Sequence, residues 1–130
     1  MYVQHVKRNR RLGETISAQD IRDLRYRLSA DPKKPVSQQQ FSELLGLSWS
    51  TVARWERGGH PDRHMARKLS RLSDTLNVLG EMVKRDYRLA FLQQHHPLLL
   101  NLRPIDLLDT EEGAMAVIRL LEGAETGAFA

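Results

Sequence analysis

Two short helices separated by a tight turn are the feature that most constrains the fold, and residues 36–58, VSQQQFSELLGLSWSTVARWERG, encode both. Ser37 followed by Gln40 has the spacing of a capping box, which begins a helix by satisfying its free backbone N–H groups. Gly46 suits the left-handed conformation that often ends a helix, and Ser48 suits the N-cap of the next one. These signals together predict a helix-turn-helix.

Further start and stop signals predict additional helices on both sides of this unit. Ser17, with Asp20 three residues later, begins a helix that the prolines of ADPKKP at residues 30–35 end. A long helix begins near Asp62, and a break is expected between Gly80 and Asp86 because glycine weakens helices. The apolar residues of the long helix follow a heptad seam made of Met65, Leu69, Leu72, Leu76, Leu79 and Val83. Such a seam forms either the core of the same chain or a contact between two subunits.

Prolines divide the last third of the chain into shorter helices. One helical stripe is expected to hold Tyr87, Ala90, Phe91 and Gln94. Pro104 suits the first position of a short helix, and Thr110 is expected to cap a final helix whose first turn is acidic. The fold class is therefore all-α, built from two small helical units. A weak strand signal is confined to Tyr2–Val6.

Charge is distributed unevenly along the chain. Residues 1–60 carry eleven Lys and Arg against six Asp and Glu, a balance of +5, residues 61–95 carry a balance of +3, and residues 96–130 carry −4. A basic front suits a polyanion and an acidic rear suits a different partner, although an uneven solvated surface would give the same numbers. The first 16 residues contain the basic run VKRNRR and are expected to form a disordered or partly ordered arm; some such arms enter a minor groove.

Composition argues against several classes of function. The chain has no Cys, so disulfide, thiolate and cysteine-zinc chemistry are absent, as expected for a cytosolic protein. No run of 18 apolar residues predicts a membrane span, and the basic N-terminus lacks the apolar segment of a secretory signal. His60 and His64 have a metal-ligand spacing, but Pro61 intervenes and no third ligand follows. Without a phosphate-binding loop or a catalytic constellation, we expect no enzyme activity, metal or cofactor.

The helix after Ser48 has the two faces of a helix that reads DNA. Val52 and Trp55 are expected to point inward, which leaves the other side free for a major groove. Arg54 has the geometry to chelate guanine O6 and N7, and Trp49 or Ala53 to touch a thymine methyl. The predicted DNA contacts are Lys33, Lys34, Gln38, Ser48, Trp49, Ser50, Thr51, Ala53, Arg54 and Arg57. The alternative is a helical hairpin that never meets DNA.

Residues 36–58 resemble the Xre (Cro/C1-type) helix-turn-helix family. The opening Ser-Gln, the turn glycine, the Ser-x-x-Thr-aliphatic run from Ser48 and the Glu before the final Gly all fit its pattern. The resemblance implies that an arginine of the first helix, Arg25, pairs with Glu56. It covers about residues 18–75, and the inserted ADPKKP loop departs from the family near the phosphates.

Residues 91–130 resemble the toxin-binding domain of Xre/MbcA/ParS antitoxins. The frame consists of Phe91-Leu92, Pro97-Leu98, Pro104 with Leu107-Leu108, Thr110-x-x-Gly113, an apolar stripe and a late glycine, whereas LLLNL replaces a commoner glycine-containing spacer. The resemblance implies a toxin-binding set of Arg103, Glu122, Glu125, Thr126, Phe129 and Ala130. Phe129 would then plug the toxin, although a frayed tail residue fits the sequence equally well.

The expected organisation is a basic arm at 1–16, a DNA-binding domain at 17–80 and a toxin-binding domain at 81–130. Together the resemblances imply a type II antitoxin that neutralises a NAD-consuming RES-domain toxin and represses its own operon. Such a protein would be bacterial and cytoplasmic, nucleoid-associated when bound to operator DNA, and dimeric, because one recognition helix covers few base pairs. The alternatives are a stand-alone repressor without a toxin partner and a protein-binding adaptor that has lost DNA contact.

Overall fold

The computed structural model describes residues 15–125, with the side chains of residues 124 and 125 left out. Its elements are α2 (Ala18–Leu28), α3 (Gln38–Leu45), α4 (Trp49–Glu56), α5 (Arg63–Leu79), η1 (Arg85–Tyr87), α6 (Arg88–Gln93), η2 (Pro97–Leu99), α7 (Pro104–Leu107) and α8 (Glu111–Glu125). The described part is all-α, with one isolated β-bridge between His96 and Leu102. The weak strand signal at Tyr2–Val6 lies outside the described residues.

Local capping signals place the first helices where the sequence predicts them. Ser17 caps α2 and Ser37 caps α3, and each forms a complete capping box, with Asp20 and Gln40 respectively. Gly46 ends α3 with a φ of 71°, in the left-handed region. Asp62 caps α5 by accepting a hydrogen bond from the backbone of Met65, and α5 ends at Leu79 as the glycine after it predicts.

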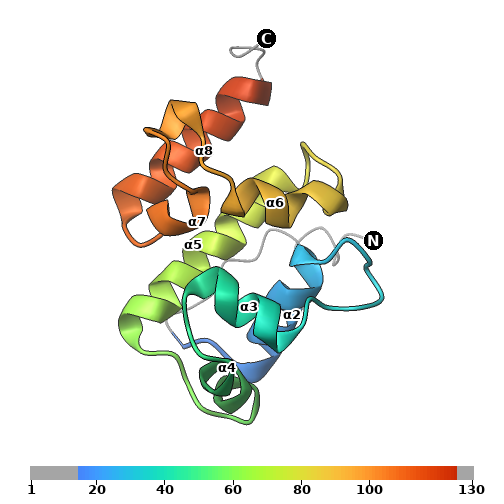
Figure 1. Ribbon diagram of the computed structural model, residues 1–130. Helices are drawn as coiled ribbons and strands as arrows, with labels where there is room; N and C mark the ends of the chain where they lie inside the picture. The colour runs from blue at the N-terminus through green and yellow to red at the C-terminus, as the bar shows by residue number, and fades with distance from the viewer. Residues whose placement is uncertain (1–14, 126–130) are drawn as a thin grey trace, which may run out of the picture.

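Helix α5 runs through the middle of the molecule and joins its two halves. In Figure 1, α2, α3 and α4 cluster around the N-terminal part of α5, while α6, α7 and α8 lie around its other end. The contacts agree, because α4 packs on α2 and α3, α5 packs on α2 and α8, and α7 packs on α6 and α8. None of the described helices combines the length and the hydropathy needed to cross a membrane.

The heptad seam of α5 is the core of its own chain. Leu69, Leu72, Leu76 and Leu79 are each no more than 3% exposed, and Met65 and Val83 at the two ends pack against the same core with partial exposure. Burial this complete within one chain leaves no seam for a second subunit. The structure therefore supports the intrachain alternative.

The stripe expected in α6 includes exposed residues, and the fully buried residue is one that the stripe leaves out. Leu92 is fully buried, whereas Ala90 and Gln94 are exposed and Tyr87 is 60% exposed. Helix α6 begins only at Arg88, so Tyr87 belongs to η1 and does not continue the helical register. Further along, Pro104 starts α7 and the hydroxyl of Thr110 accepts a hydrogen bond from the backbone N–H of Gly113 at 3.0 Å, both as predicted.

Arginine and lysine side chains hold the irregular segments to the helices. Arg85 donates to the carbonyls of Ser29 and Tyr26, and Arg88 donates to that of Arg27 at 2.9 Å, so the C-terminal end of α2 is capped from η1 and α6. From α5, Arg71 donates to the carbonyls of residues 108 and 109, and Lys68 forms a 2.7 Å ion pair with Asp109. The two halves are thus tied together by side chains far apart in sequence.

Candidate nucleic-acid interface and C-terminal site

Helix α4 is fixed from behind by its buried residues. Val52 is fully buried and Trp55 is 3% exposed, as predicted for its inward face. The turn before the helix is tight, with the backbone N–H of Leu47 donating to the carbonyl of Ser42 at 2.8 Å. Since α4 packs on both α2 and α3, its outward face has a fixed orientation.

A buried ion pair adds to this rigidity. Nη1 of Arg25 on α2 lies 2.8 Å and 2.7 Å from the two carboxylate oxygens of Glu56 at the end of α4, and Nε donates to the carbonyl of Val36 at 2.9 Å. Their side chains are 12% and 9% exposed. The pairing expected from the Xre resemblance is therefore confirmed, and it connects α2, α4 and the start of α3.

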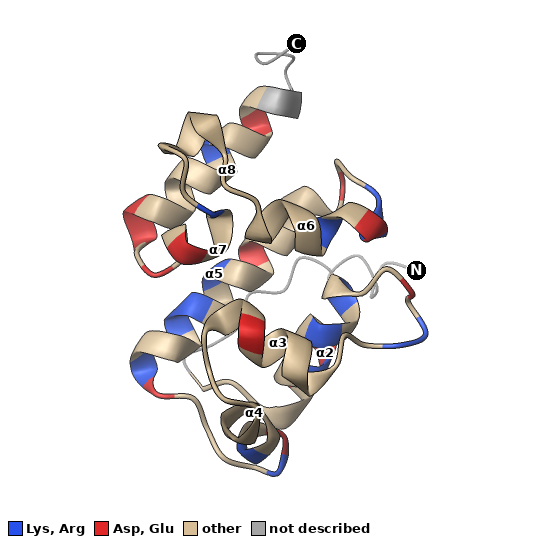
Figure 2. Cartoon of the chain, viewed as in Figure 1, with Lys and Arg blue, Asp and Glu red and all other residues tan. Residues whose placement is uncertain are grey.

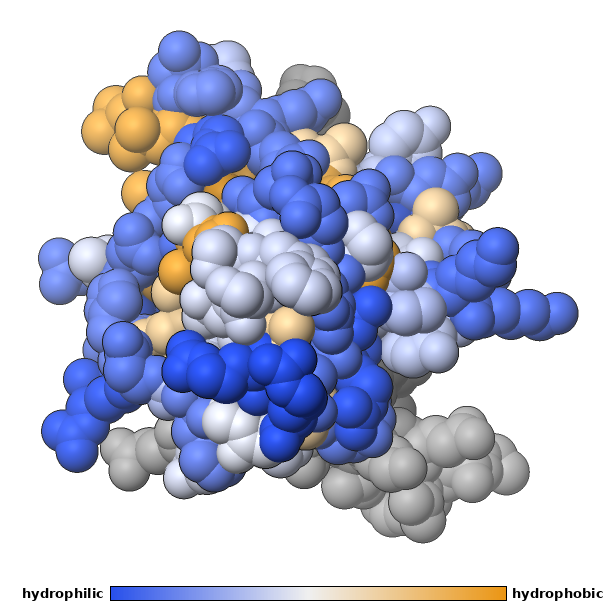
Figure 3. Space-filling view, turned by 60° about the horizontal axis from the view of Figure 1, so that its bottom comes forward, coloured by the Kyte–Doolittle hydropathy of each residue, from blue (hydrophilic) through white to orange (hydrophobic). Residues whose placement is uncertain are grey.

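Hydroxyl groups and a large aromatic side chain occupy the first turn of α4. Trp49 is 53% exposed, and Ser48, Ser50 and Thr51 form a hydroxyl network with oxygen distances of 2.9 and 3.1 Å. Ser48 stands at the N-cap as predicted, but its side chain makes no capping hydrogen bond because it bonds the other two hydroxyls. Figure 3 looks at this end of the molecule, and hydrophilic residues cover most of it.

The placement of Ala53 on the outer face is wrong. Ala53 is only 5% exposed, whereas the neighbouring Arg54 is exposed. The reason is that an eight-residue helix packed against two others, α2 and α3, buries a wide arc that includes Val52, Ala53 and Trp55. A base contact by the methyl group of Ala53 is therefore not part of the interface that the structure presents.

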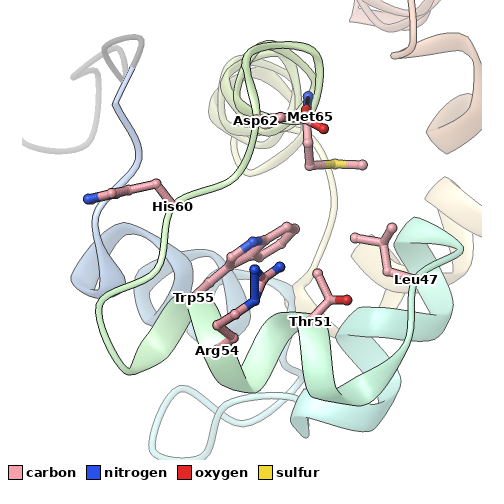
Figure 4. Close-up of a pocket in the computed structure, with 7 residues that line it drawn as sticks. All are labelled: Leu47, Thr51, Arg54, Trp55, His60, Asp62 and Met65. Atoms are coloured by element: carbon pink, nitrogen blue, oxygen red, sulfur yellow. Dashed lines mark hydrogen bonds between the residues drawn. The ribbon is translucent and has the colours of Figure 1, made fainter.

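An open cavity of about 260 Å³ lies between α4 and the start of α5, lined by Leu47, Thr51, Arg54, Trp55, His60, Asp62 and Met65. In Figure 4 the side chain of Arg54 lies beside the indole of Trp55, and His60 turns away from the other lining residues. Nδ1 of His60 lies 3.3 Å from the carbonyl oxygen of Ile16, and Ile16 is itself only 1% exposed. This contact holds the start of the described chain beside the C-terminal end of α4.

The predicted phosphate-contacting residues are exposed or partly exposed. Lys33 and Lys34 are exposed in the loop before α3, Gln38 is half-buried at the first position of α3, and Arg57 is exposed at the end of α4. Figure 2 shows basic residues both in the loop that follows α4 and in the first turns of α5. The contacts of these residues with DNA stay predictions.

The C-terminal half places only some of its predicted site residues within the described region. Arg103 is paired inside the chain, with Nε and Nη2 donating to the carboxylate of Asp106 at 2.8 and 2.9 Å. That hydrogen bonding lowers the pKa of Asp106 and raises the pKa of Arg103. Glu122 is exposed near the end of α8. The side chain of Glu125 and residues Thr126, Phe129 and Ala130 lie outside the part of the chain whose side chains are described.

Sequence reasoning missed the exposed leucines of the segment between α6 and α7. Leu98 is 59% exposed, Leu100 87% and Leu102 45%. The signal was present, because LLLNL stands where the family has a glycine-containing spacer, but the apolar run suggests a buried segment. Within the described residues no group of three or more His, Asp or Glu side chains could hold a metal ion.

Two protein-family models match different parts of the chain. Residues 34–74 match a helix-turn-helix family, and residues 78–127 match the antitoxin Xre/MbcA/ParS C-terminal toxin-binding domain. The two matches meet within α5, close to the boundary expected at residues 80 and 81, which stays a prediction. A search of curated proteins gives no match.

The fold is also that of a solved structure. A chain in the crystal structure of the M. tuberculosis MbcT–MbcA toxin–antitoxin complex superposes with a TM-score of 0.62 and is 19% identical, and the match covers 87% of this chain and 96% of that one. The similarity extends over both halves and the long helix that joins them. The superposition shows the fold, and the two family models identify a helix-turn-helix in residues 34–74 and an antitoxin Xre/MbcA/ParS C-terminal toxin-binding domain in residues 78–127.

Proposed function

We propose that this protein is a type II antitoxin that binds operator DNA through α4 and a toxin through its C-terminal half. The observation that carries the DNA-binding part is the outward face of α4, where Trp49, Ser50 and Arg54 are exposed while Val52 and Trp55 hold the helix from behind. Rigid placement matters because a recognition helix reads bases only if its side chains reach fixed positions in the groove.

Arg54 is the side chain to which we assign base recognition. It is exposed on α4, and its guanidinium suits the paired acceptors of guanine in the major groove. Trp49, also exposed, offers an apolar surface to a thymine methyl. Lys33, Lys34, Gln38 and Arg57 are assigned to phosphate contacts, which position the protein without reading sequence.

Substitution of Arg54 tests this assignment. Arg54→Ala is expected to weaken binding to the preferred operator by about 1–3 kcal/mol and to relax base choice at one position. The matched control is Lys33→Ala, which should weaken binding to all sequences alike and reduce the dependence of affinity on salt. Fluorescence anisotropy with the DNA upstream of the gene and with scrambled DNA measures both. An equal loss on both DNAs for Arg54→Ala would remove it from base recognition.

Binding to an operator is proposed to require two copies of the chain. One α4 spans few base pairs, so a dimer would contact half-sites about 34–36 Å apart. The heptad seam is buried inside the chain, so the dimer must use another surface. Sedimentation of the protein with operator duplex should give two chains per site, and one chain per complete site would contradict the dimer.

The toxin partner is proposed to be a RES-domain protein that consumes NAD, with repression of the shared operon as the regulatory role. Support comes from the match of residues 78–127 to a toxin-binding domain and from the fold shared with a chain of a toxin–antitoxin complex. Co-expression with the product of the neighbouring reading frame tests it, because an antitoxin restores growth and cellular NAD. Growth arrest that persists despite soluble expression of this chain would favour a stand-alone repressor.

Removal of residues 122–130 separates the two activities. The family resemblance places toxin contacts at this end, and the nine residues lie far from α4 in sequence. We expect the shortened chain to bind operator DNA with unchanged affinity while it loses toxin neutralisation. Loss of both activities together would show that the end of α8 supports the fold.

A further inference from the structure

A strained turn joins η2 to α7 in the C-terminal half. The backbone N–H of Leu102 donates to the carbonyl of Leu99 at 3.0 Å, and the N–H of His96 donates to the carbonyl of Leu102 at 3.1 Å, so residues 96–102 form a very short hairpin. Leu100 and Asn101 at its tip have φ angles of 57° and 62°. Two successive left-handed residues are the signature of a type I′ turn, which favours Asn, Asp and Gly.

Leu100 adopts a backbone conformation that leucine disfavours. Asn101 tolerates left-handed backbone, but a leucine there brings its Cβ close to the following carbonyl, at a cost in free energy. Burial does not offset this cost within the chain, because Leu100 is 87% exposed. A side chain that is both strained and exposed contributes nothing to folding, and observed strain of this kind points to a functional role.

The turn carries a small apolar surface that is rigidly mounted. Leu98, Leu100 and Leu102, which we call the leucine hairpin, are 59%, 87% and 45% exposed. Leu99, within the same segment, is 6% exposed and belongs to the hydrophobic core, so it anchors the hairpin. Residues that combine exposure, apolar character and a fixed backbone are suited to insert into a pocket of another protein at low cost in conformational entropy.

We propose that the leucine hairpin inserts into an apolar pocket on the toxin and forms a contact separate from the C-terminal end of the chain. This inference rests on the proposed function. The hairpin lies within residues 78–127, the part that matches a toxin-binding domain. In Figure 1 it belongs to the orange segment between α6 and α7, at the upper left of the view.

The net charge of the C-terminal segment favours the toxin, rather than a second copy of this chain, as the occupant of the hairpin. Helix α8 packs against both η2 and α7, and its first turn exposes Glu111 and Glu112. Residues 96–130 carry a balance of −4. A two-fold contact between identical chains would bring these acidic surfaces together, whereas a pocket with a basic rim on a different protein would complement them.

Substitutions at Leu100 test the proposal, because they should weaken toxin binding without lowering the stability of the free protein. Leu100→Asn removes the apolar side chain and replaces it with a residue that a type I′ turn prefers, so the thermal midpoint of the free protein should stay the same or rise. Its affinity for the toxin, taken as a catalytically inactive form of the neighbouring gene's product, should fall at least tenfold in calorimetric titration. Leu100→Gly should behave in the same way. If Leu100 had only a structural role, a substitution that keeps the stability of the protein would not weaken toxin binding.

Tyr87→Asn is the matched control, because Tyr87 is 60% exposed in the same half but belongs to η1, away from the hairpin. Its toxin affinity should remain within twofold of the wild type. Wild-type affinity in both Leu100 variants would overturn the hairpin contact while leaving the antitoxin function intact. Failure of the wild-type protein to bind the toxin would overturn the proposed function itself. Dissociation of a toxin-free dimer by Leu100→Asn would assign the hairpin to a second copy of the chain.

Discussion

Helix α4 and the leucine hairpin both present side chains to solvent, but their backbones are stabilised in different ways. The signals that set α4 lie within the chain around it: Gly46 supplies the left-handed turn and Val52 and Trp55 bury the inner face. The hairpin contradicts local preference at Leu100 and is held to the core by the buried Leu99. The exposed surface of α4 is built on regular helix, whereas the apolar surface of the leucine hairpin is built on strained backbone.

The same contrast holds for the ways in which helix ends are satisfied. Helices α2 and α3 are capped at their starts by residues three positions away, Ser17 with Asp20 and Ser37 with Gln40. The end of α7 relies on Arg71 of α5, which donates to carbonyls 37 and 38 residues further along the chain. The carbonyls at the end of α7 therefore depend on a distant side chain, whereas the starts of α2 and α3 depend on their own neighbours.

Loss of the ion pair in the N-terminal half should have the largest effect on stability. Arg25→Leu leaves the carboxylate of Glu56, 9% exposed, without its cation and removes a donor from the carbonyl of Val36. Uncompensated buried charge of this kind costs about 3–4 kcal/mol. Urea denaturation measures the loss, with Arg22→Leu on the same helix as a control expected to stay within about 0.5 kcal/mol.

The double substitution Arg25→Leu with Glu56→Leu checks the cause. Replacement of both charged partners by apolar residues should recover most of the lost stability, because no unpaired charge remains. If the double variant is as unstable as the single one, the packing of the arginine stem, and not the ion pair, carries the effect.

The second largest effect is expected at Gly113 in the C-terminal half. A Cβ built on Gly113 would collide with the carbonyl oxygen of Leu107 and lie 2.9 Å from its carbonyl carbon. Helix propensity alone predicts that Gly113→Ala stabilises α8 by about 1 kcal/mol. The contact with α7 backbone reverses the sign, and we expect a loss of about 3 kcal/mol.

Thermal denaturation of Gly113→Ala decides between these two effects. Met115→Ala on the same helix is the control, because Met115 is 47% exposed and should change stability by no more than about 0.5 kcal/mol. A rise in midpoint for Gly113→Ala would mean that α8 does not approach α7 this closely. The close approach also explains physically why the Thr-x-x-Gly pattern has glycine at this position.

The sequence predicts the N-terminal half well because its determinants are local. Capping residues, the turn glycine and the pair of Arg25 with Glu56 could each be found from spacing or from the family pattern. Ala53 could not be placed, because its burial depends on how α4 packs between two other helices. The cap at Ser48 was right in position and wrong in bonding, since Ser50 and Thr51 compete for the same hydroxyl.

The C-terminal half is less predictable for the same physical reason. Pro104 and Thr110 mark helix starts correctly, because those preferences act within one turn of helix. The leucine hairpin is invisible to such rules, since a run of leucines indicates burial and a left-handed leucine opposes local preference. Arg103, which the family resemblance places among the toxin contacts, pairs with Asp106 three residues later, and its contact with a toxin stays a prediction.

A smaller effect should follow from the second ion pair, which is asymmetric. Lys68 is 6% exposed and Asp109 is 51% exposed, so water screens the carboxylate side of the pair. Asp109→Asn is expected to cost about 1–2 kcal/mol, less than Arg25→Leu, and Lys68→Met should cost less still because it removes the buried charge. Equal losses for Asp109→Asn and Arg25→Leu in urea would show that exposure does not distinguish the two pairs.

The smallest effect is expected at Arg88, where two influences oppose each other. Its Nη1 donates to the carbonyl of Arg27, but its Nε is buried without a partner among the described residues. Burial lowers the pKa of Arg27 and the pKa of Arg88. A neighbouring cation lowers each of them further, Arg88 in the case of Arg27 and Arg85 in the case of Arg88. Arg88→Met loses one hydrogen bond, removes the unpaired N–H and relieves repulsion, so stability should change by no more than about 0.5 kcal/mol.

Arg85→Met is the informative comparison for that result. Arg85 donates to the carbonyls of Tyr26 and Ser29, and its loss should cost about 1 kcal/mol because the end of α2 then has fewer donors. Both variants are measured by urea denaturation under the same conditions. If Arg88→Met lowers the free energy of unfolding as much as Arg85→Met does, the two arginines contribute equally to capping the end of α2. The repulsion between Arg88 and Arg27 would then be too weak to offset a single hydrogen bond, and the junction of the two halves would be held more firmly than its charges suggest.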